Sequence, residues 1–317
     1  MNNNMHPLDS LSVDEIKKSV NIFKSDNNSD ENSVFSYISL EEPDKNFVKN
    51  YKVGDTFSRK TKIIGVDSSS KGFEASIDLN KEKVTSLNVI PDAAGPTYTM
   101  SEIMIAIQLT LENDEYQAAL EKRGITDLSL IQIDPWPGGG ITHEKIKEGH
   151  RALKTISFLK ESPEDNAYAK PISGLISHVD LTDKCIVEIE DQGISNLPEQ
   201  SAKYDAASQE VLRNRPKDIS ITQPDGPGFD VSNNEISWEG WNLRVSIDPI
   251  EGLVIQNLNL NKREIFYRAS MSDMVVPYGS ADPMHSWKAV HDGTEYGFGS
   301  LSNSLTLGCD CLGEIYY

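Results

Sequence analysis

Residues 226–255 read GPGFDVSNNEISWEGWNLRVSIDPIEGLVI, a run in which short apolar and β-branched segments alternate with turn-forming residues. This alternation is typical of antiparallel strands joined by tight turns. The pattern continues past the run and predicts strands at residues 235–241, 243–247, 253–258 and 264–268. Residues 226–317 are therefore predicted to open an all-β domain. They number about 90, which is small for a β-sandwich, so we expect some strands to lack partners.

The chain before this region predicts a small α+β unit over residues 1–92. Ser12 and Glu15 have the spacing of a capping box and precede an amphipathic pattern, which predicts a helix over 12–24. Alternating segments separated by turn formers follow, and we expect strands at 35–40, 60–66 and 73–79. One helix packed on several antiparallel strands is an α+β arrangement.

Residues 93–195 show the same order of elements. Ser101 and Glu102 open an apolar helical pattern, and a second helical stretch covers 116–122. Strands are expected after it at 128–133, 151–159, 174–180 and 185–190. Residues 196–225 are rich in Pro, Gln, Asn and Asp, which predicts a linker. The two units share a plan, but no repeat is visible at the level of residues.

The composition limits the partners and the compartment. Thirty Lys plus Arg against forty-nine Asp plus Glu give a formal charge of -19. Such a charge repels nucleic acid and anionic membranes and favours cationic ligands such as amines, although it also serves solubility. No apolar run reaches the roughly 18–20 residues that span a bilayer. The N-terminus lacks the basic and apolar regions of a secretory signal. We therefore expect a cytoplasmic protein with no nucleic-acid or membrane partner.

The three cysteines are Cys185, Cys309 and Cys311. An odd number cannot form a closed set of disulfides within one chain. Cys309 and Cys311 stand two residues apart, at the far limit of Cα separation for a bridge on an extended backbone, so we expect no bond between them. Cys185 is expected to be a small buried hydrophobe.

A series of ordered motifs resembles the copper amine oxidases. Besides 226–255, the motifs are HPLDSLSVDEI at 6–16, FSYISLEEPDK at 35–45, IDPWPGG at 133–139, SPEDNAYAKPISGLISHVDL at 162–181, YRASMSDMVVPYGSADP at 267–283, HDGTEYGFG at 291–299 and NSLTLGCDCLGEIYY at 303–317. The resemblance implies two cystatin-like α+β domains followed by the first strands of an incomplete catalytic β-sandwich. It also implies a primary-amine oxidase that uses copper and topaquinone, acts on a primary amine and oxygen, and forms a homodimer.

The resemblance assigns two catalytic roles. Asp292 corresponds to the family's catalytic base, the Asp of a D-x-G-E-Y motif, which abstracts a proton from the substrate's α-carbon. An apolar cleft would disfavour its charged form and move its pKa toward the working pH. Here Gly293 precedes Thr294, a departure from the family order, and Asp-Gly alone is also typical of a hairpin turn. Tyr278 corresponds to the tyrosine that positions the quinone ring through its hydroxyl.

Further residues correspond to the family's substrate channel, and for all of them except Val290 packing within a core is the alternative role. They are Val290, Trp287, Trp136, Pro135 and Tyr168. Val290 corresponds to a position where many members carry a gating tyrosine. Because valine is smaller, the resemblance suggests a wider mouth of the substrate channel. Cys311 corresponds to a cysteine whose disulfide partner lies further along the family sequence. Residues 138–140 are three glycines, which we interpret as a flexible turn because no Lys-Ser/Thr step follows.

Two parts of the family's machinery are missing from this sequence. The quinone forms from the tyrosine of a T-x-x-N-Y-D/E motif, and the single Asn-Tyr pair, Asn50-Tyr51, lacks the upstream Thr and the acidic residue that follows. Copper needs three imidazoles, two of them in an H-x-H step, which the six histidines do not provide. We therefore expect the chain to be an inactive N-terminal fragment that binds neither cofactor. The alternative is a non-catalytic interaction module built on the two α+β domains.

Overall fold

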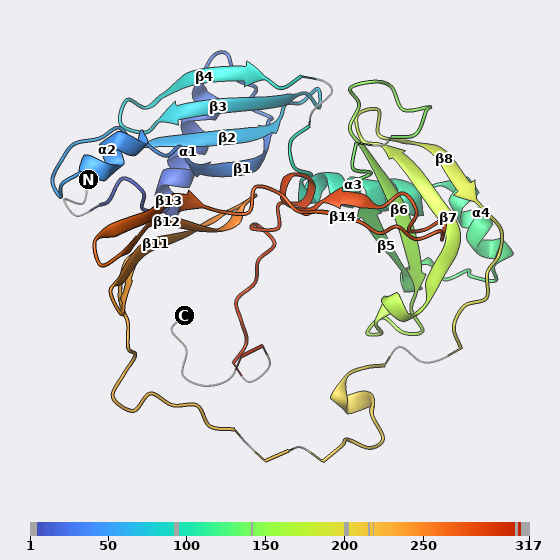
Figure 1. Ribbon diagram of the computed structural model, residues 1–317. Coiled ribbons are helices and arrows are strands. Elements are labelled where there is room, and N and C mark those ends of the chain that lie inside the picture. The colour runs from blue at the N-terminus through green and yellow to red at the C-terminus, as the bar shows by residue number, and fades with distance from the viewer. Residues whose placement is uncertain are drawn as a thin grey trace.

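The computed structural model describes residues 5–91, 95–140, 142–199, 203–214, 216–217, 219–307 and 310–311. These residues form two α+β units and a third, β-rich part that contacts both (Figure 1). Within these ranges, each helix is too short or too polar to cross a bilayer. The mixed α+β class and the order of two small units before a β-rich part confirm the prediction from sequence.

The first unit packs one helix against a four-stranded antiparallel sheet in the order β1-β2-β3-β4. Its elements are α1 (Val13–Ser25), β1 (Val34–Leu40), α2 (Lys45–Asn50), β2 (Lys60–Val66), β3 (Gly72–Asp78) and β4 (Lys83–Val89). Phe23 of α1 is buried and stacks on Phe73 of β3, with 4.9 Å between ring centroids, while Phe35 meets Phe23 edge-on at 5.4 Å. These aromatic contacts join the helix to the sheet.

The second unit has the same plan, with sheet order β5-β6-β7-β8. Its elements are α3 (Met100–Leu111), α4 (Asp114–Lys122), η1 (Leu128–Leu130), β5 (Ile131–Trp136), β6 (Ala152–Leu159), η2 (Ala167–Ala169), β7 (Pro171–Asp180) and β8 (Cys185–Asp191). Tyr116 of α4 is buried in this core, and its hydroxyl shares a 2.6 Å hydrogen bond with the Ser157 hydroxyl of β6. The core therefore includes a polar contact that has its partner, as burial requires.

A buried arginine anchors the first helix of each unit to its sheet. Arg59 precedes β2, and its Nε donates to Glu15 of the α1 capping box at 2.8 Å. Arg151 precedes β6, and its Nη2 donates to Glu102 of the α3 capping box at 3.1 Å. Each arginine also donates to a backbone carbonyl in the loop before its helix. The two units therefore share a residue-level device that the sequence did not reveal.

The turn after the third strand of each sheet repeats as well. Asp78 ends β3 and Asp180 ends β7, and each carboxylate accepts N–H bonds from the backbone two and three residues later. Glu82 and Lys184 follow at equivalent places, and both have φ of 52°, in the left-handed region. Equivalent turn geometry at equivalent places indicates that the two units have one architecture in detail.

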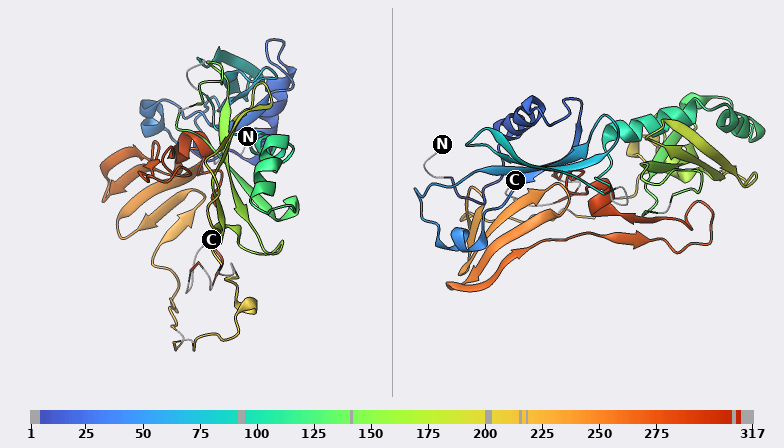
Figure 2. Two further views of the ribbon diagram at one scale, coloured as in Figure 1. Left: turned by 90° about the vertical axis from the view of Figure 1, so that its right-hand side faces the viewer. Right: turned by 90° about the horizontal axis from the view of Figure 1, so that it is seen from above.

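The third part is a five-stranded meander in the order β13-β12-β11-β10-β9, followed by a hairpin and a π-helical turn. Its elements are β9 (Asp230–Ser232), β10 (Glu235–Trp238), β11 (Trp241–Asp248), β12 (Gly252–Leu260), β13 (Arg263–Ala269), β14 (Val275–Pro277), β15 (Ala289–His291) and η4 (Asp292–Tyr296). Seen from above in Figure 2, α1, α3 and α4 lie along one side of the molecule, and the meander and hairpin lie along the other, with α2 beside the meander. The segment between β8 and β9, which contains η3 (Ala206–Ser208), runs beneath both units (Figure 1).

Charged and hydroxyl groups fasten the meander to the first unit. Asp248, at the end of β11, accepts hydrogen bonds from the Tyr37 hydroxyl at 2.9 Å and the Ser39 hydroxyl at 3.0 Å. The guanidinium of Arg244 forms a close ion pair with Asp9. Asp248 and Arg244 are both buried, so these contacts are shielded from solvent. The first unit therefore fixes the sheet from which the hairpin extends.

Some element bounds differ from the prediction. The strands expected at 235–241 and 243–247 meet at a turn through Glu239 and Gly240, both with positive φ, so β10 ends before it and β11 begins at Trp241. α3 begins one residue earlier than expected, because the Thr99 side chain supplies the cap. α2 and β4 were missed, since α2 has six residues and β4 is a largely exposed edge strand. Cys185 is exposed, so the expected burial was wrong.

Replacing Arg151 by Met should lower the free energy of unfolding by about 3–5 kcal/mol, because it leaves the Glu102 carboxylate half-buried without its partner. Denaturant unfolding measures the change. Lys147→Met is the control, since this exposed lysine pairs with Asp183 at the surface, where solvent screens the ion pair, and its loss should change the free energy of unfolding far less. Equal effects of the two substitutions would show that the buried arginine does not anchor the helix.

Candidate functional site

The β14–β15 hairpin lies along the second unit and brings together residues that are far apart in the sequence (Figure 1). Tyr278 follows β14, and its ring meets Trp136, at the end of β5, edge-on with 5.7 Å between centroids. Tyr296 of η4 lies 6.2 Å from the same indole and donates its hydroxyl to the Pro135 carbonyl at 2.8 Å. The structure therefore gathers Tyr278, Trp136 and Pro135 beside the turn that carries Asp292.

Asp273 holds that turn in place through one carboxylate. It accepts hydrogen bonds from the backbone of Gly293 at 3.0 Å and of Thr294 at 3.3 Å, and from the Thr294 hydroxyl at 2.7 Å. The two backbone bonds reach Oδ1 and the hydroxyl bond reaches Oδ2, which also lies 2.9 Å from His291 Nδ1. Burial raises the pKa of Asp273, but the hydrogen bonds from Thr294 and His291 outweigh burial and lower the pKa to about 2. The carboxylate is therefore charged across the working pH range.

The Asp-Gly step in this turn has a packing reason. A Cβ placed on Gly293 would lie 2.7 Å from an Asp273 oxygen and 3.3 Å from its Cα. Glycine lets the backbone approach the carboxylate closely enough to donate to it. Asp292 and Gly293 open the π-helical turn η4 and do not form a two-residue hairpin turn. The inverted Gly-Thr order therefore still allows an ordered turn after the candidate base.

Two other parts of the chain contact this turn or the β15 strand that leads into it. Tyr98 and Thr97, in the connection between the first and second units, donate to the carbonyls of Glu295 and Thr294, each at 2.9 Å. Gly139, with φ of 60°, follows β5, and a Cβ there would lie 2.3 Å from the Ala289 carbonyl oxygen of β15. The three glycines at 138–140 therefore include a close packing contact with the hairpin, where the sequence suggested a flexible turn.

Asp292 is half-buried at the first position of η4. Its backbone is fixed, because its N–H donates to the Met274 carbonyl at 2.8 Å and its carbonyl accepts from Phe298 at 3.1 Å. Its carboxylate accepts no hydrogen bond from any other described residue. The Asp292 carboxylate therefore has a fixed backbone and is not committed to a described partner.

Glu295 is a second carboxyl group on the same turn. One of its oxygens accepts from the His291 backbone at 2.8 Å. Burial raises its pKa, although hydrogen bonds from the His291 and Gly139 backbones oppose that rise. Tyr296 beside it also has a raised pKa, caused first by burial and then by the charges of Asp134 and Glu295. The turn therefore presents two carboxyl groups in different environments.

Lys288 lies at the centre of the aromatic group. It is 3% exposed, and its Nζ lies 3.7 Å from the Trp136 ring centroid, 5.2 Å from that of Tyr278 and 5.9 Å from that of Trp287. Burial lowers its pKa to about 8, although Asp134 and Asp282 act in the opposite direction. No spacing or motif in the sequence indicated this residue.

The remaining expected site residues lie around this group. Val290 is 1% exposed in β15, paired with Val276, so in this chain it faces protein. Trp287 packs against a buried cluster that contains Met284, and Tyr168 is 60% exposed on η2. Their roles in a substrate channel stay predictions. The backbone of Cys311 forms an isolated β-bridge with that of Leu307, and Cys309 lies outside the described residues.

The side chains in the described ranges do not fit a site of three imidazoles. One group of three potential metal ligands occurs there, namely His150, Asp180 and Asp183, with a single imidazole. In it, His150 Nδ1 and Asp180 already share a 2.8 Å hydrogen bond. Tyr51, of the Asn-Tyr pair, donates its hydroxyl to the Met5 carbonyl and packs among aromatic rings.

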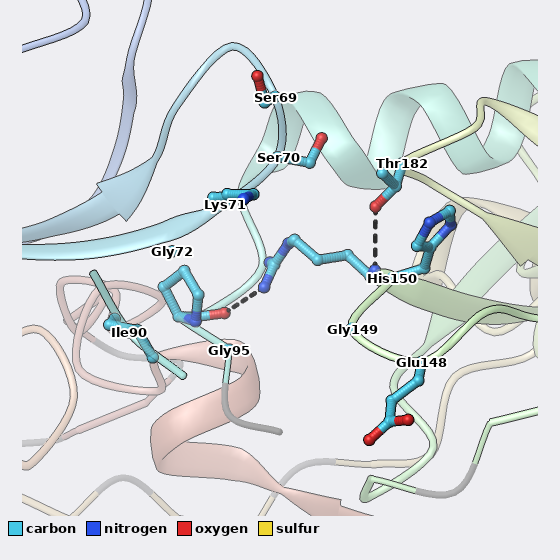
Figure 3. Close-up of a pocket in the computed structure, with 12 residues that line it drawn as sticks. Ser69, Ser70, Lys71, Gly72, Ile90, Gly95, Glu148, Gly149, His150 and Thr182 are labelled. Carbon is cyan, nitrogen blue, oxygen red and sulfur yellow. Dashed lines mark hydrogen bonds between the residues drawn. The ribbon is translucent and has the colours of Figure 1, made fainter. Parts of the chain in front are cut away.

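A separate cavity lies between the first and second units (Figure 3). The Arg151 side chain crosses it and donates to the Pro96 carbonyl at 2.9 Å, and its backbone donates to the Thr182 hydroxyl at 3.1 Å. Because Glu102 already pairs with this guanidinium, the arginine is committed to structure. The cavity marks the junction between the units and contains none of the expected site residues.

Comparison with known protein families agrees with this arrangement. Three models match in order: the copper amine oxidase N2 domain at residues 6–90, the N3 domain at 101–209 and the enzyme domain at 230–317. The chain belongs to the copper amine oxidase family. This confirms the resemblance seen in the sequence, with its two small domains before the start of the catalytic sheet.

Individual relatives in the copper amine oxidase family support the same assignment. A primary amine oxidase from Arthrobacter sp. (strain P1) is 35% identical over 317 residues, covering 98% of this chain and 48% of the relative. A histamine oxidase from Arthrobacter globiformis is 34% identical over 323 residues, covering 98% and 46%. The chain spans about half the length of the curated relatives it matches.

A solved structure shares the fold. The copper-containing benzylamine oxidase from Hansenula polymorpha superposes with a TM-score of 0.84 at 24% identity, covering 98% of this chain and 51% of that one. At this identity the likeness concerns the fold. It covers both small units and the β-rich part, so their mutual arrangement is that of a copper amine oxidase.

Replacing Asp273 by Ala should loosen η4 at a cost of about 1–3 kcal/mol, because the N–H groups of Gly293 and Thr294 lose their acceptor. Hydrogen-exchange protection of these two amides measures the loss. Asp55→Ala, in an exposed turn of the first unit, is the control and should leave both amides unchanged. Unchanged protection in the Asp273 variant would contradict the assigned role.

The Asp273 contribution should also depend on pH with a defined sign. Its pKa is lowered to about 2, from an ordinary value of ~3.9. Its stabilisation is therefore present above pH ~4 and is lost as the pH falls through about 2. The protection factors of Gly293 and Thr294 should fall over this range in the native chain and stay flat in Asp273→Asn. A pH dependence that survives in Asp273→Asn would assign it to another group.

Proposed function

We propose that this chain supplies the amine-binding and proton-abstracting part of a primary-amine oxidase that depends on copper and topaquinone. The observation that carries the proposal is the placement of Tyr278, Trp136 and the Asp292 turn in one group, on a chain of the copper amine oxidase family. The overall reaction would convert a primary amine, oxygen and water into an aldehyde, ammonia and hydrogen peroxide. The chain by itself is proposed to be inactive, since it lacks the quinone tyrosine motif and the H-x-H step.

Asp292 is proposed as the base. Hydrogen bonds to Met274 and Phe298 hold its backbone, and Asp273 holds the turn, so the point from which the Asp292 side chain extends is fixed. It would take a proton from the carbon next to the amine nitrogen. Burial of the neighbouring Tyr296 and Glu295 makes the surroundings less polar than water, which strengthens proton transfer to a carboxylate.

Tyr278 and the channel residues are proposed to orient the amine. The Tyr278 backbone N–H donates to the Lys288 carbonyl at 3.0 Å, and its ring is set by contact with Trp136. Its hydroxyl would position the quinone, as the family resemblance implies. Trp136, Pro135, Trp287, Tyr168 and Val290 would line the approach.

The domain division is proposed on the same basis, with small domains at 1–92 and 93–195, a linker at 196–225 and the start of the catalytic domain at 226–317. The parent oxidase is proposed to act as a homodimer. Asp248 and its partners Tyr37 and Ser39 would keep the first domain attached to the catalytic sheet.

The test compares this chain with a polypeptide that continues through the family's copper-binding region. Both are expressed with copper, stained for quinone and assayed for peroxide with benzylamine and methylamine. We expect no peroxide from the chain alone and turnover from the longer polypeptide. Asp292→Asn should lower kcat by about 10²–10⁴-fold, since a general base contributes that much.

Ser302→Ala, in an exposed loop after the site, is the matched control and should keep full turnover. Turnover by the chain alone would contradict the proposed inactivity. Full activity of Asp292→Asn in the longer polypeptide would remove Asp292 from the mechanism.

A further inference from the structure

Lys288 is a buried cation whose ammonium lies against aromatic rings, with no close carboxylate among the described residues. Its Nζ lies within 5.9 Å of three ring centroids, those of Trp136, Tyr278 and Trp287. Among the described residues, no carboxylate oxygen approaches it within ion-pair distance, although Asp134 and Asp282 act on it from further away. Proteins bind ammonium ligands in aromatic cages of this kind.

The backbone around Lys288 fixes the ammonium in this position. Its N–H donates to the His285 carbonyl and its carbonyl accepts from Tyr278, both at 3.0 Å. Two further polar atoms here, Trp287 Nε1 and His285 Nδ1, are buried without a hydrogen-bond partner among the described residues. The lysine ammonium, a group of the same chemistry as a primary amine, therefore lies in preformed polar and aromatic surroundings.

We propose that Lys288 determines amine specificity, because its ammonium occupies the aromatic cage of Trp136, Tyr278 and Trp287 and so disfavours substrates that carry a second positive charge. This inference rests on the proposed function, which places the amine between Asp292 and Tyr278. The tail of a bound amine would then extend along the Trp136 side, toward Lys288. Like charges brought together in a buried site repel strongly, so a diamine would bind less well than an amine with an uncharged tail.

Discrimination should depend on pH because Lys288 is the cage group that changes charge near pH 8. Asp134 on β5, Asp282 and His285 act on its charge, and Tyr278 lies beside it. Lys154 on β6 lies over the Trp287 ring, Tyr296 on η4 contacts the Trp136 ring, and Glu295 acts on Tyr296. Burial lowers the pKa of His285, so that imidazole is already neutral at pH 8. The pKa of Tyr296 is raised above its usual value, so that phenol stays neutral. Discrimination should therefore fade above pH 8.

The cage is tested first on this chain without any cofactor. Carbon-13 labelling of the lysine ε-carbons follows each amine by NMR as the pH is raised, and the signal that disappears in Lys288→Met is assigned to Lys288. We expect its midpoint near 8. The reference is Lys147, an exposed lysine assigned by Lys147→Met, whose pKa is raised above its ordinary value by the hydrogen bond to Asp183. A Lys288 midpoint at or above 10 would overturn the cage.

Specificity is tested in the longer, copper-loaded polypeptide with benzylamine and 1,4-diaminobutane. Lys288→Met should raise the kcat/KM ratio of diamine to benzylamine by about tenfold or more at pH 7, which is the change that 1.4 kcal/mol produces. At pH 9.5 the native and Met forms should have nearly equal ratios. Lys288→Arg keeps the charge at both pH values, so its discrimination should persist and lose its pH dependence.

The outcomes separate the two proposals. An unchanged ratio in Lys288→Met, with both amines still oxidised and circular dichroism showing a folded protein, would overturn the specificity role. Oxidation of neither amine by the native polypeptide would instead overturn the proposed function and the specificity role that rests on it. The NMR midpoint would then still decide whether the cage exists.

Discussion

The position of Asp292 depends on how the Asp292–Tyr296 turn is held. On one side, the Asp273 carboxylate accepts a hydrogen bond from a backbone N–H of the turn. On the other side, Thr97 and Tyr98 donate hydrogen bonds to backbone carbonyls of the turn. These groups come from the β-rich part and from the connection between the two small units. A catalytic residue on a short turn needs support of this kind, because a displacement of about 1 Å can cost on the order of 10²-fold in rate. The small units are therefore part of the site's geometry.

Each of the two α+β units also has its own contact with the β-rich part. The first unit contacts the meander through Asp248, and the second presents Trp136 to Tyr278 and the Pro135 carbonyl to Tyr296 of η4. Arg59 and Arg151 join each unit's first helix to its sheet through ion pairs with the capping-box glutamates. The family match, with its two small domains ahead of the enzyme domain, gives this arrangement an enzymatic context.

Much of the fold could be predicted from the sequence, because capping boxes and alternating strands are local signals. The α1 capping box of Ser12 and Glu15 was found in this way. The equivalence of Arg59 and Arg151 was not, since it depends on where a strand begins relative to a distant helix. At the site, the motif match indicated Asp292, Tyr278 and Trp136. Lys288 and Asp273 escaped because burial and long-range hydrogen bonds define their roles.

In the proposed reaction Asp292, and not Glu295 on the same turn, moves the substrate proton. The most direct measurement compares proton abstraction from the α-carbon of benzylamine and its α-deuterated form in Asp292→Asn and Glu295→Gln, each in a polypeptide that also contains the copper-binding region. We expect Asp292→Asn to lower the rate of proton abstraction by about 10²–10⁴-fold and Glu295→Gln to keep most of that rate. A larger loss in Glu295→Gln would contradict it, because Glu295 would then be the base.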